Sequence, residues 1–259
     1  MTPAMTTATT TASGRGAPSV PPGALRRPGR ALVVIGDEVP AWAQRWCDRS
    51  AREVRHYPVA RHPSEPASAD RVSGIADITI RAARCGDPVL VLPVLQQARK
   101  EPPRVIAAVR HLHDDVQALT EAATCAGCMG ADLVVAHGLP ASFGERSIGL
   151  DDAVQDAGRL LDAAVRAAAS SVPGLRVRPW LARVRPHELV GEELDADLLV
   201  LGGPRADQWE RLGLVARSAL FHAPCPVLLT PRPMRTAPGP WSRTRGEESK
   251  AIPTAGDRS

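Results

Sequence analysis

The chain has 259 residues, enough for one or two domains; 44% of them are apolar and only 3% aromatic, so the core must be aliphatic and rich in alanine. The net charge is +4, and the 32 lysines and arginines are scattered rather than gathered with aromatic residues, which argues against nucleic-acid binding. No apolar run is long enough for a transmembrane helix, and residues 1–30 lack the basic start and apolar core of a secretory signal.

Residues 1–29 are rich in Thr, Ala, Pro and Gly without a hydrophobic period, which predicts a disordered tail. An unbroken apolar run over 30–36 then ends in glycine, as in a parallel strand that is covered on both faces. Pro40 stands where a helix can begin, and Pro58 marks the next strand as an edge strand. The following elements are expected: a helix over 41–51, a strand over 53–60, a helix over 70–84, a strand over 88–92 and a polar linker over 96–103.

The segment 104–231 alternates strands and helices more regularly. Asp114 and Asp115 are expected to cap a helix that Gly130 ends, and Pro186 to begin a short one. Residues 232–259 turn to Pro, Arg, Ser and Glu, which predicts a second disordered tail. Strands alternating with helices imply a parallel sheet with helices on both faces. The expected strands are 104–109, 132–137, 176–184, 197–201 and 226–230, and the expected helices 116–129, 151–170, 186–194 and 206–222.

Three stretches of 104–231 resemble the universal stress protein family (UspA-like), namely 105–109, 130–137 and 219–227, the last with the sequence Ala-Leu-Phe-His-Ala-Pro-Cys-Pro-Val. The resemblance implies the family's adenine-nucleotide α-hydrolase-like α/β fold, with an open parallel sheet of five strands. It also implies a stress-response protein that acts without enzymatic activity.

The first segment, 30–95, resembles a smaller, degenerate copy of the same family. Residues 34–40 are similar to the family's first strand and turn, and residues 74–85 with 88–91 to its last helix and strand. About 65 residues are too few for every element of a full copy. The resemblance therefore implies a tandem protein with a shortened first half, a linker at 96–103 and a universal stress domain at 104–231.

Family members that bind ATP use an aspartate after the first strand and a loop of the form Gly-two residues-Gly-nine residues-Gly-Ser/Thr around the phosphates. Glycines let backbone N–H groups approach phosphate closely, and a helix start adds a favourable dipole. Here Arg110 stands at the aspartate position, and Gly202 with Gly203 begins the loop. Arg205 replaces the second loop glycine, and Gly213 comes two residues early, followed by Leu214 in place of the hydroxyl.

These departures predict that ATP binding is weakened or lost, so that no cofactor is needed and the protein acts through protein contacts. Family members associate through their last strands, and residues 88–92 and 226–230 are expected to pair within one chain, as an intramolecular pseudo-dimer, or between chains, as a homodimer. The alternative is an adenine-nucleotide-binding switch or slow ATPase with a rearranged site at Arg110, Gly202, Gly203 and Gly213. A site filled by Trp209 or Arg205 would favour the loss of ATP binding, and an open site would favour the nucleotide-binding alternative.

Cysteines and histidines offer weaker candidates. Five cysteines without a disulfide-framework spacing suit a reducing compartment, so a cytoplasmic location is expected, with no membrane partner. Cys125 and Cys128 form a Cys-x-x-Cys pair near the end of a predicted helix, where the dipole opposes a thiolate; packing is favoured over redox chemistry. His111 and His113 stand beside two aspartates, but neighbours on a turn seldom converge on one ion, so no metal site is predicted.

Overall fold

Eight strands lie in one sheet in the part of the chain that the computed structural model describes, residues 31–58, 69–93, 103–140, 150–205 and 212–232. The strands are β1 (Ala31–Ile35), β2 (Glu53–Tyr57), β3 (Val89–Val91), β4 (Arg104–Ala108), β5 (Asp132–Gly138), β6 (Val177–Ala182), β7 (Leu198–Arg205) and β8 (Val227–Arg232). The helices are α1 (Ala41–Arg49), α2 (Ala69–Arg84), α3 (Leu112–Met129), α5 (Leu150–Ser171) and α6 (Leu214–His222).

The strand order is β2-β1-β3-β8-β7-β4-β5-β6. The five strands from β4 to β8 are all parallel to their neighbours, which confirms the predicted open parallel sheet. The three strands of the first segment are parallel to one another as well. They join the larger group through an antiparallel pair, β3 with β8, in which Leu90 lies opposite Leu228. The two segments therefore share one sheet.

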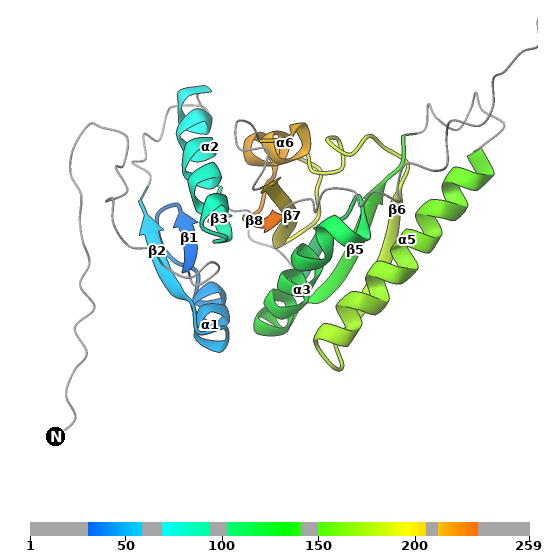
Figure 1. Cartoon of the computed structure of the whole chain (residues 1–259), viewed down its shortest axis with the longest axis horizontal. Coiled ribbons are helices and arrows are strands. Elements are labelled where there is room, and N and C mark those ends of the chain that lie inside the picture. Colours follow the sequence, from blue (N-terminus) through cyan, green and yellow to red (C-terminus); the bar gives the residue numbers. More distant parts are fainter. Residues whose placement is uncertain (1–30, 59–68, 94–102, 141–149, 206–211, 233–259) are drawn as a thin grey trace, which may run out of the picture.

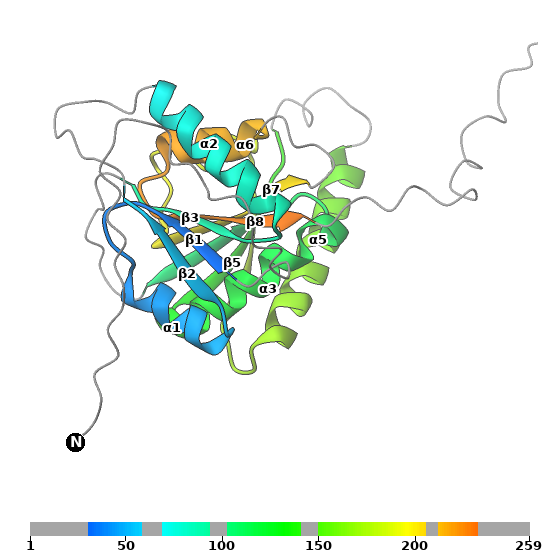
Figure 2. The same ribbon diagram turned by 60° about the vertical axis from the view of Figure 1, so that its left-hand side comes forward.

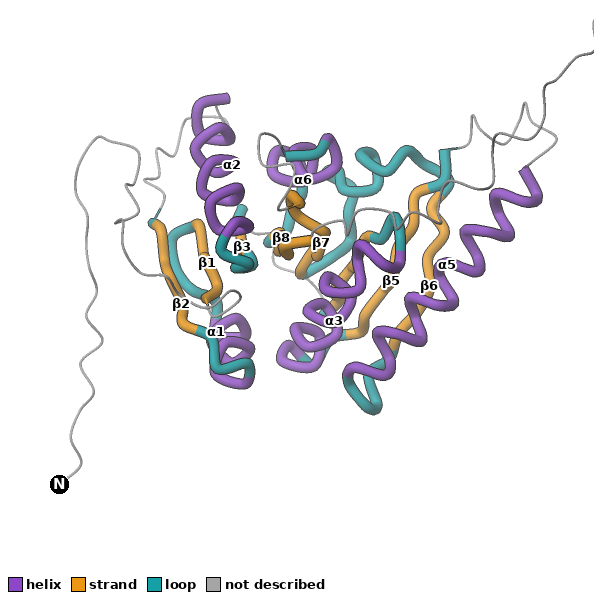
Figure 3. The backbone as a smooth tube through the Cα atoms, in the orientation of Figure 1, coloured by secondary structure: helices purple, strands orange, loops and turns teal. Residues whose placement is uncertain are grey.

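Helices cover both faces of this sheet (Figures 1 and 2). Helices α1, α3 and α5 lie on one side, and α2 and α6 lie on the other. The tube view separates the helices from the turns that connect them, and it shows only turns in the described chain between β6 and β7 (Figure 3). The fold is thus a three-layer α/β arrangement, as expected for strands that alternate with helices.

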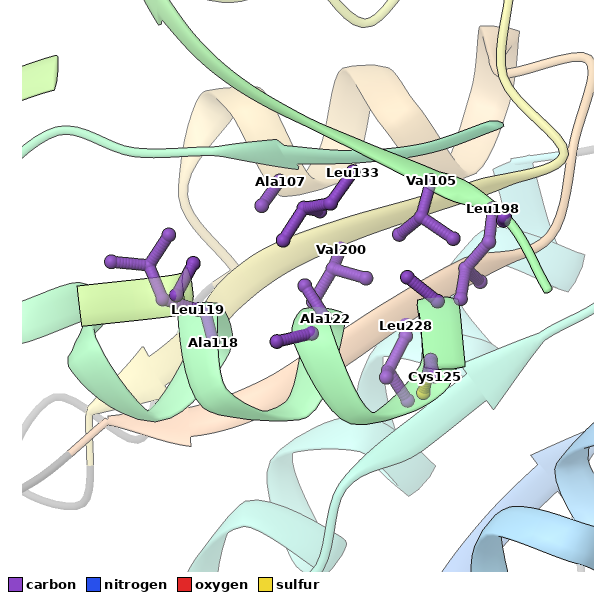
Figure 4. Packing of buried hydrophobic residues seen from close by; sticks show 14 of the residues in the cluster. Val105, Ala107, Ala118, Leu119, Ala122, Cys125, Leu133, Leu198, Val200 and Leu228 are labelled. Carbon is purple, nitrogen blue, oxygen red and sulfur yellow. The ribbon is translucent and has the colours of Figure 1, made fainter. Parts of the chain in front are cut away.

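The core between the sheet and α3 is aliphatic, as the composition requires. Ala118, Leu119, Ala122 and Cys125 of α3 point toward sheet residues that include Val200, and all of them are almost fully buried (Figure 4). Small residues on this helix let it lie close to the strands. Gly130 ends the helix in the left-handed conformation, with φ at 65°, as predicted for a helix stop.

Helix α1 of the first segment packs against α3. Trp46 is fully buried, and the guanidinium of Arg52 lies 4.7 Å from the centre of its ring. Both terminal nitrogens of Arg52 donate to the carboxylate of Glu121 in α3, one of them at 3.0 Å. A bidentate pair of this kind fixes orientation as well as distance. The contact ties the first segment to the second on the face opposite α2.

Several elements differ from the sequence-based expectation. Helix α3 begins at Leu112, four residues before the predicted start: His111 is at the N-cap position, and Asp115 lies within the first turn. Residues 186–194 form turns rather than a helix. Strand β7 continues to Arg205, and Arg232, expected in the tail, is the last residue of β8. The predicted tails, the linker and the first part of the expected helix over 206–222 lie mostly outside the described residues.

Candidate functional site

The predicted site residues lie at the carboxyl ends of two neighbouring strands. Strands β4 and β7 are parallel neighbours, so Arg110, just after β4, and Gly202, within β7, come to the same edge of the sheet. Such an edge is where ligands bind in open α/β sheets. Gly213 precedes α6, is exposed and has no atom within 4 Å of where a Cβ would stand.

An ion pair between Asp115 and Arg232 lies directly against Gly202; we call it the closing ion pair. Arg232 donates to Asp115 Oδ1 from Nε at 3.0 Å and from Nη2 at 2.7 Å. The side chain of Asp115 is fully buried, whereas that of Arg232 is 25% exposed. The two residues are 117 positions apart in the sequence. The pair therefore links the end of the last strand to the first turn of α3.

The second carboxylate oxygen of Asp115 is also fully engaged. Asp115 Oδ2 accepts hydrogen bonds from the backbone N–H groups of Arg110 at 2.7 Å and His111 at 3.1 Å. Asp115 was expected at a capping position before the helix. It lies inside the first turn instead, and its side chain reaches back to the residues that precede the helix. Its charge lies near the positive end of the helix dipole, which stabilises a carboxylate there. Four donors thus hold one buried anion.

Gly202 is needed for this arrangement. A Cβ at this position would lie 2.6 Å from Asp115 Oδ1 and 2.7 Å from Arg232 Nη2, much closer than van der Waals contact allows. In the family's loop, the corresponding glycine admits phosphate. In this chain, the space above the glycine is taken by the protein's own carboxylate and guanidinium.

Gly203 serves a different contact. Its missing Cβ would stand 2.9 Å from the carbonyl oxygen of Thr230 in β8, so the glycine lets the two strands approach closely. Thr230 in turn donates from its hydroxyl to the carbonyl of Leu201 at 3.2 Å. Gly203 is therefore explained by strand packing alone. Arg205 takes part in the pairing of β7 with β8 through its backbone, and Trp209 lies outside the described residues.

Replacing Gly202 with alanine is expected to lower the free energy of unfolding by about 2–4 kcal/mol, because the new methyl group displaces the closing ion pair from a buried position. Urea denaturation monitored by circular dichroism measures the change. Gly213→Ala is the matched control: that glycine has an ordinary φ of −62° and open space around it, so a change within about 1 kcal/mol is expected. Equal losses in both variants would contradict the role given to Gly202.

The Cys-x-x-Cys pair is part of the core. Cys125 is fully buried and Cys128 is 6% exposed, and both thiols are free. Burial raises the pKa of Cys125 well above its usual value, which disfavours the reactive thiolate. Burial likewise raises the pKa of Cys47, which lies in α1 within the same core cluster, to about 11. Cys47 and Cys125 thus resemble small apolar side chains, as the packing interpretation predicts, whereas Cys128 Sγ also accepts a hydrogen bond from Arg49 Nη1 at 3.5 Å.

In the native protein, a thiol reagent such as Ellman's reagent is expected to modify Cys85, the one exposed cysteine in the described chain, well before the other four. Cys47 and Cys125 should react only at the rate of unfolding, because both are buried and both have raised pKa values. Mass spectrometry of the labelled protein identifies the modified residues. Fast labelling of Cys125 or Cys128 would contradict the packing interpretation and support redox chemistry at this pair.

The described residues also lack a metal site and a membrane-spanning helix. No group of three or more His, Cys, Asp or Glu side chains there is placed to hold a metal ion. His113 Nδ1 and Asp114 Oδ1 lie 3.7 Å apart on the exposed start of α3, without a third ligand. None of the described helices is both long and apolar enough to cross a membrane.

Neither member of the closing ion pair is predicted from the sequence in this role, since Asp115 has the context of a helix cap and Arg232 that of a tail residue. Arg232 was assigned to the tail, although side chains alternate along a strand, so a continued β8 would bring Arg232 to the face of Leu228 and Thr230. Leu228 contacts the core cluster that α3 covers, which places Arg232 on the side of Asp115. The alternation was visible in the sequence, but the length of the strand was not.

Comparison with known proteins agrees with this architecture. The model of the Universal stress protein family matches residues 102–231, slightly more than half of the chain. No curated protein matches the sequence significantly.

Solved structures of universal stress proteins also resemble the chain. One from Archaeoglobus fulgidus is 26% identical, covers 49% of this chain and 97% of its own length, and has a TM-score of 0.42. The protein solved from the same organism in complex with dAMP is 28% identical, covers 49% of this chain and 95% of its own length, with a TM-score of 0.40. A universal stress protein in complex with cAMP is 16% identical, covers 51% of this chain and 98% of its own length, with a TM-score of 0.39.

Apart from Arg232, the last residue of β8, the five parallel strands with helices on both faces lie within the residues that the family model matches. The stretches that carry the sequence resemblance, including the last helix and last strand, lie there as well. The chain belongs to the Universal stress protein family.

Proposed function

We propose that this protein is a non-enzymatic stress-response protein that acts through protein contacts and has lost the family's mode of ATP binding. The closing ion pair is the observation that carries the proposal, because Asp115 and Arg232 lie within 3 Å of the position where a side chain on Gly202 would begin. A phosphate that approached the backbone of Gly202 in the family's manner would have to displace both groups.

The energetics oppose such displacement. Moving Arg232 away leaves a fully buried carboxylate with only two backbone donors, and removing one partner of a buried ion pair costs about 3–5 kcal/mol. A phosphate group beside Asp115 would also bring two negative charges together where water is excluded. Arg110, which stands at the position of the family's aspartate, does not supply the missing acidic contact.

We further propose that the first segment acts as a built-in partner, so that the chain is an intramolecular pseudo-dimer. Strand β3 covers the edge of β8 in antiparallel orientation, with Val89 opposite Leu229 and Val91 opposite Val227. A last strand with an uncovered edge would otherwise offer unpaired backbone groups to a second copy. The antiparallel pair supports association within one chain in place of a homodimer.

Matching hydrogen bonds support a shortened first copy of the family domain. At the start of β1, the N–H of Ala31 donates to Asp87 Oδ1 at 3.1 Å; at the start of β4, the N–H of Arg104 donates to Asp197 Oδ2 at 2.7 Å. Each aspartate lies just before the strand that pairs with the donor's strand, β3 in one half and β7 in the other. Strands β2, β1 and β3 thus correspond to β5, β4 and β7.

By this correspondence, β3 is the counterpart of β7. The sequence resemblance instead matches β3 to the family's last strand, whose counterpart in the second segment is β8. In register, Val33 pairs with Val89 and Ile106 with Leu199, so Leu92 takes the position of Gly202. A Cβ at Gly36 would stand 2.6 Å from the Cβ of Leu92, so an apolar side chain fills the equivalent space. The described residues of the first copy therefore show an apolar side chain where the family has a phosphate loop, and β8 lies beside β3 as the fourth strand of this half of the sheet.

Five free cysteines support a reducing location such as the cytoplasm. The proposed lack of enzymatic activity is supported by the same site, because its buried carboxylate is fully engaged by four donors and is not available as an acid or base.

Calorimetric titration with ATP and Mg²⁺ tests the proposal. No binding heat is expected at nucleotide concentrations up to about 1 mM, which corresponds to a binding free energy weaker than about −4 kcal/mol. The rival hypothesis, a nucleotide-binding switch or slow ATPase, predicts a dissociation constant below about 100 μM that is lost on Gly202→Trp. That result would overturn the proposed loss of ATP binding.

A further inference from the structure

We propose that the outer edge of the sheet at β6 is the docking surface for an acidic, partly apolar segment of a partner protein. The surface, which we call the basic edge, consists of Arg176, Arg178, Arg183 and Arg185 with Trp180 and Val184. It rests on the proposed function in protein contacts and gives that function a place and a partner chemistry. Strand β6 is the outermost strand of the sheet, at the end away from the first segment (Figure 1).

The basic edge combines charge with exposed apolar surface. All four arginines are exposed, and Trp180 is 40% and Val184 36% exposed, which makes them two of the few large apolar side chains in the described chain that face solvent. Arg178 and Trp180 alternate along the strand and so share one face of it, and Arg176, directly before the strand, continues the same alternation. The opposite face packs on the core through Val177 and Leu181.

Little negative charge balances these arginines. No Asp or Glu occurs anywhere over residues 172–187. Arg178 forms an ion pair with Asp132 of β5, whereas within the described chain the guanidinium groups of Arg176, Arg183 and Arg185 form none. Glu188 accepts a hydrogen bond from the backbone N–H of Arg185 rather than from its side chain. Uncompensated charge on one edge favours an acidic partner and speeds its approach.

The backbone of β6 argues against a partner that adds a strand. Leu133 N–H donates to the carbonyl of Arg176, and Leu139 N–H to that of Ala182, so even-numbered residues of β6 direct their backbone groups to β5. Pro179 is therefore an outward position, where it offers no N–H. A proline at this place blunts the edge, so the partner must be held by side chains: carboxylates on the arginines and an apolar side chain on Trp180.

A protein partner fits better than a nucleic acid. Single-stranded nucleic acids are held by several aromatic side chains on which bases stack, and this edge has one. Arg and Trp are also the residues that contribute most often to protein interfaces, and the exposed valine adds aliphatic surface that a base would not use. A segment that alternates Glu with Leu or Phe meets both requirements.

The test is fluorescence anisotropy with the full chain and two labelled probes of equal charge: a peptide of alternating Glu and Leu, and an oligothymidylate. The peptide is expected to bind and the oligonucleotide to bind at least about tenfold more weakly, a difference of about 1.4 kcal/mol. Arg176→Glu/Arg185→Glu should weaken peptide binding at least about tenfold, and Trp180→Ser several-fold. The control variant Arg166→Glu/Arg217→Glu changes the net charge by the same amount at exposed positions on α5 and α6. It should leave peptide binding unchanged.

Three results would overturn the proposal: no binding of the peptide, equal losses in the test and control variants, or preferential binding of the oligonucleotide. All substituted side chains are exposed, so circular dichroism should confirm that each variant is folded. None of these outcomes depends on ATP, so a failure here is distinguishable from a failure of the proposed loss of nucleotide binding.

Discussion

Replacing Arg232 with methionine is expected to lower the free energy of unfolding by about 3–5 kcal/mol, because it leaves the fully buried carboxylate of Asp115 without its cationic partner. Methionine keeps most of the side-chain volume, so lost packing contributes little. The two backbone N–H groups that remain cannot neutralise the charge. Urea denaturation at neutral pH measures the loss.

Two further variants make the result specific. Arg217→Met removes an exposed arginine from α6 and is expected to change stability by less than about 0.5 kcal/mol. Arg232→Lys should recover only part of the loss, because an ammonium group lacks the planar fork that places Nε and Nη2 on one carboxylate oxygen. A full recovery with lysine, or a loss below about 1 kcal/mol with methionine, would contradict the importance of the ion pair.

Replacing Trp46 with alanine is expected to lower the free energy of unfolding by about 3–5 kcal/mol, since its side chain is fully buried between α1 and the rest of the core. The change also removes the ring over which Arg52 lies, so it loosens the bidentate contact of Arg52 with Glu121. Thermal or urea unfolding gives the magnitude. Trp180→Ala removes the same group from a position 40% exposed and should cost much less.

The same experiment tests whether the two segments unfold together. Strand β3 pairs with β8, and α1 packs on α3, so the first segment shares its sheet and its core with the family domain. A single transition is therefore expected for the wild type and for Trp46→Ala, with the same midpoint by circular dichroism and by tryptophan fluorescence. Two separate transitions would show that the first segment is an independent unit.

Hydrophobic patterns predicted most of the scaffold. Runs such as those over 105–109 and 198–201 carry apolar side chains on both faces of a strand. A parallel sheet covered by helices on both sides is the arrangement that buries them. The expected pairing of 88–92 with 226–230 came from the family resemblance rather than from these patterns; in the structure β3 and β8 are antiparallel neighbours. Local patterns are sufficient when one face must be buried.

The closing ion pair could not be predicted in the same way. Asp115 has the sequence context of a helix cap, and only its contact with a residue 117 positions away shows the other role. The predicted start of α3 was wrong for the same reason. The carboxylate of Asp115 reaches back to Arg110 and His111, and the helix already begins at Leu112, three residues before Asp115. Long-range pairing of charges leaves no periodic trace in a sequence.

Extraction of nucleotide from the purified native chain tests the central claim most directly. The protein is unfolded in acid, the supernatant is separated by anion-exchange chromatography, and the nucleotide is counted per chain. Because Asp115 and Arg232 take the space beside Gly202, the expected result is no stoichiometric nucleotide in the wild type. An adenine nucleotide recovered at close to one per chain, and lost in Gly202→Trp, would contradict the closed site.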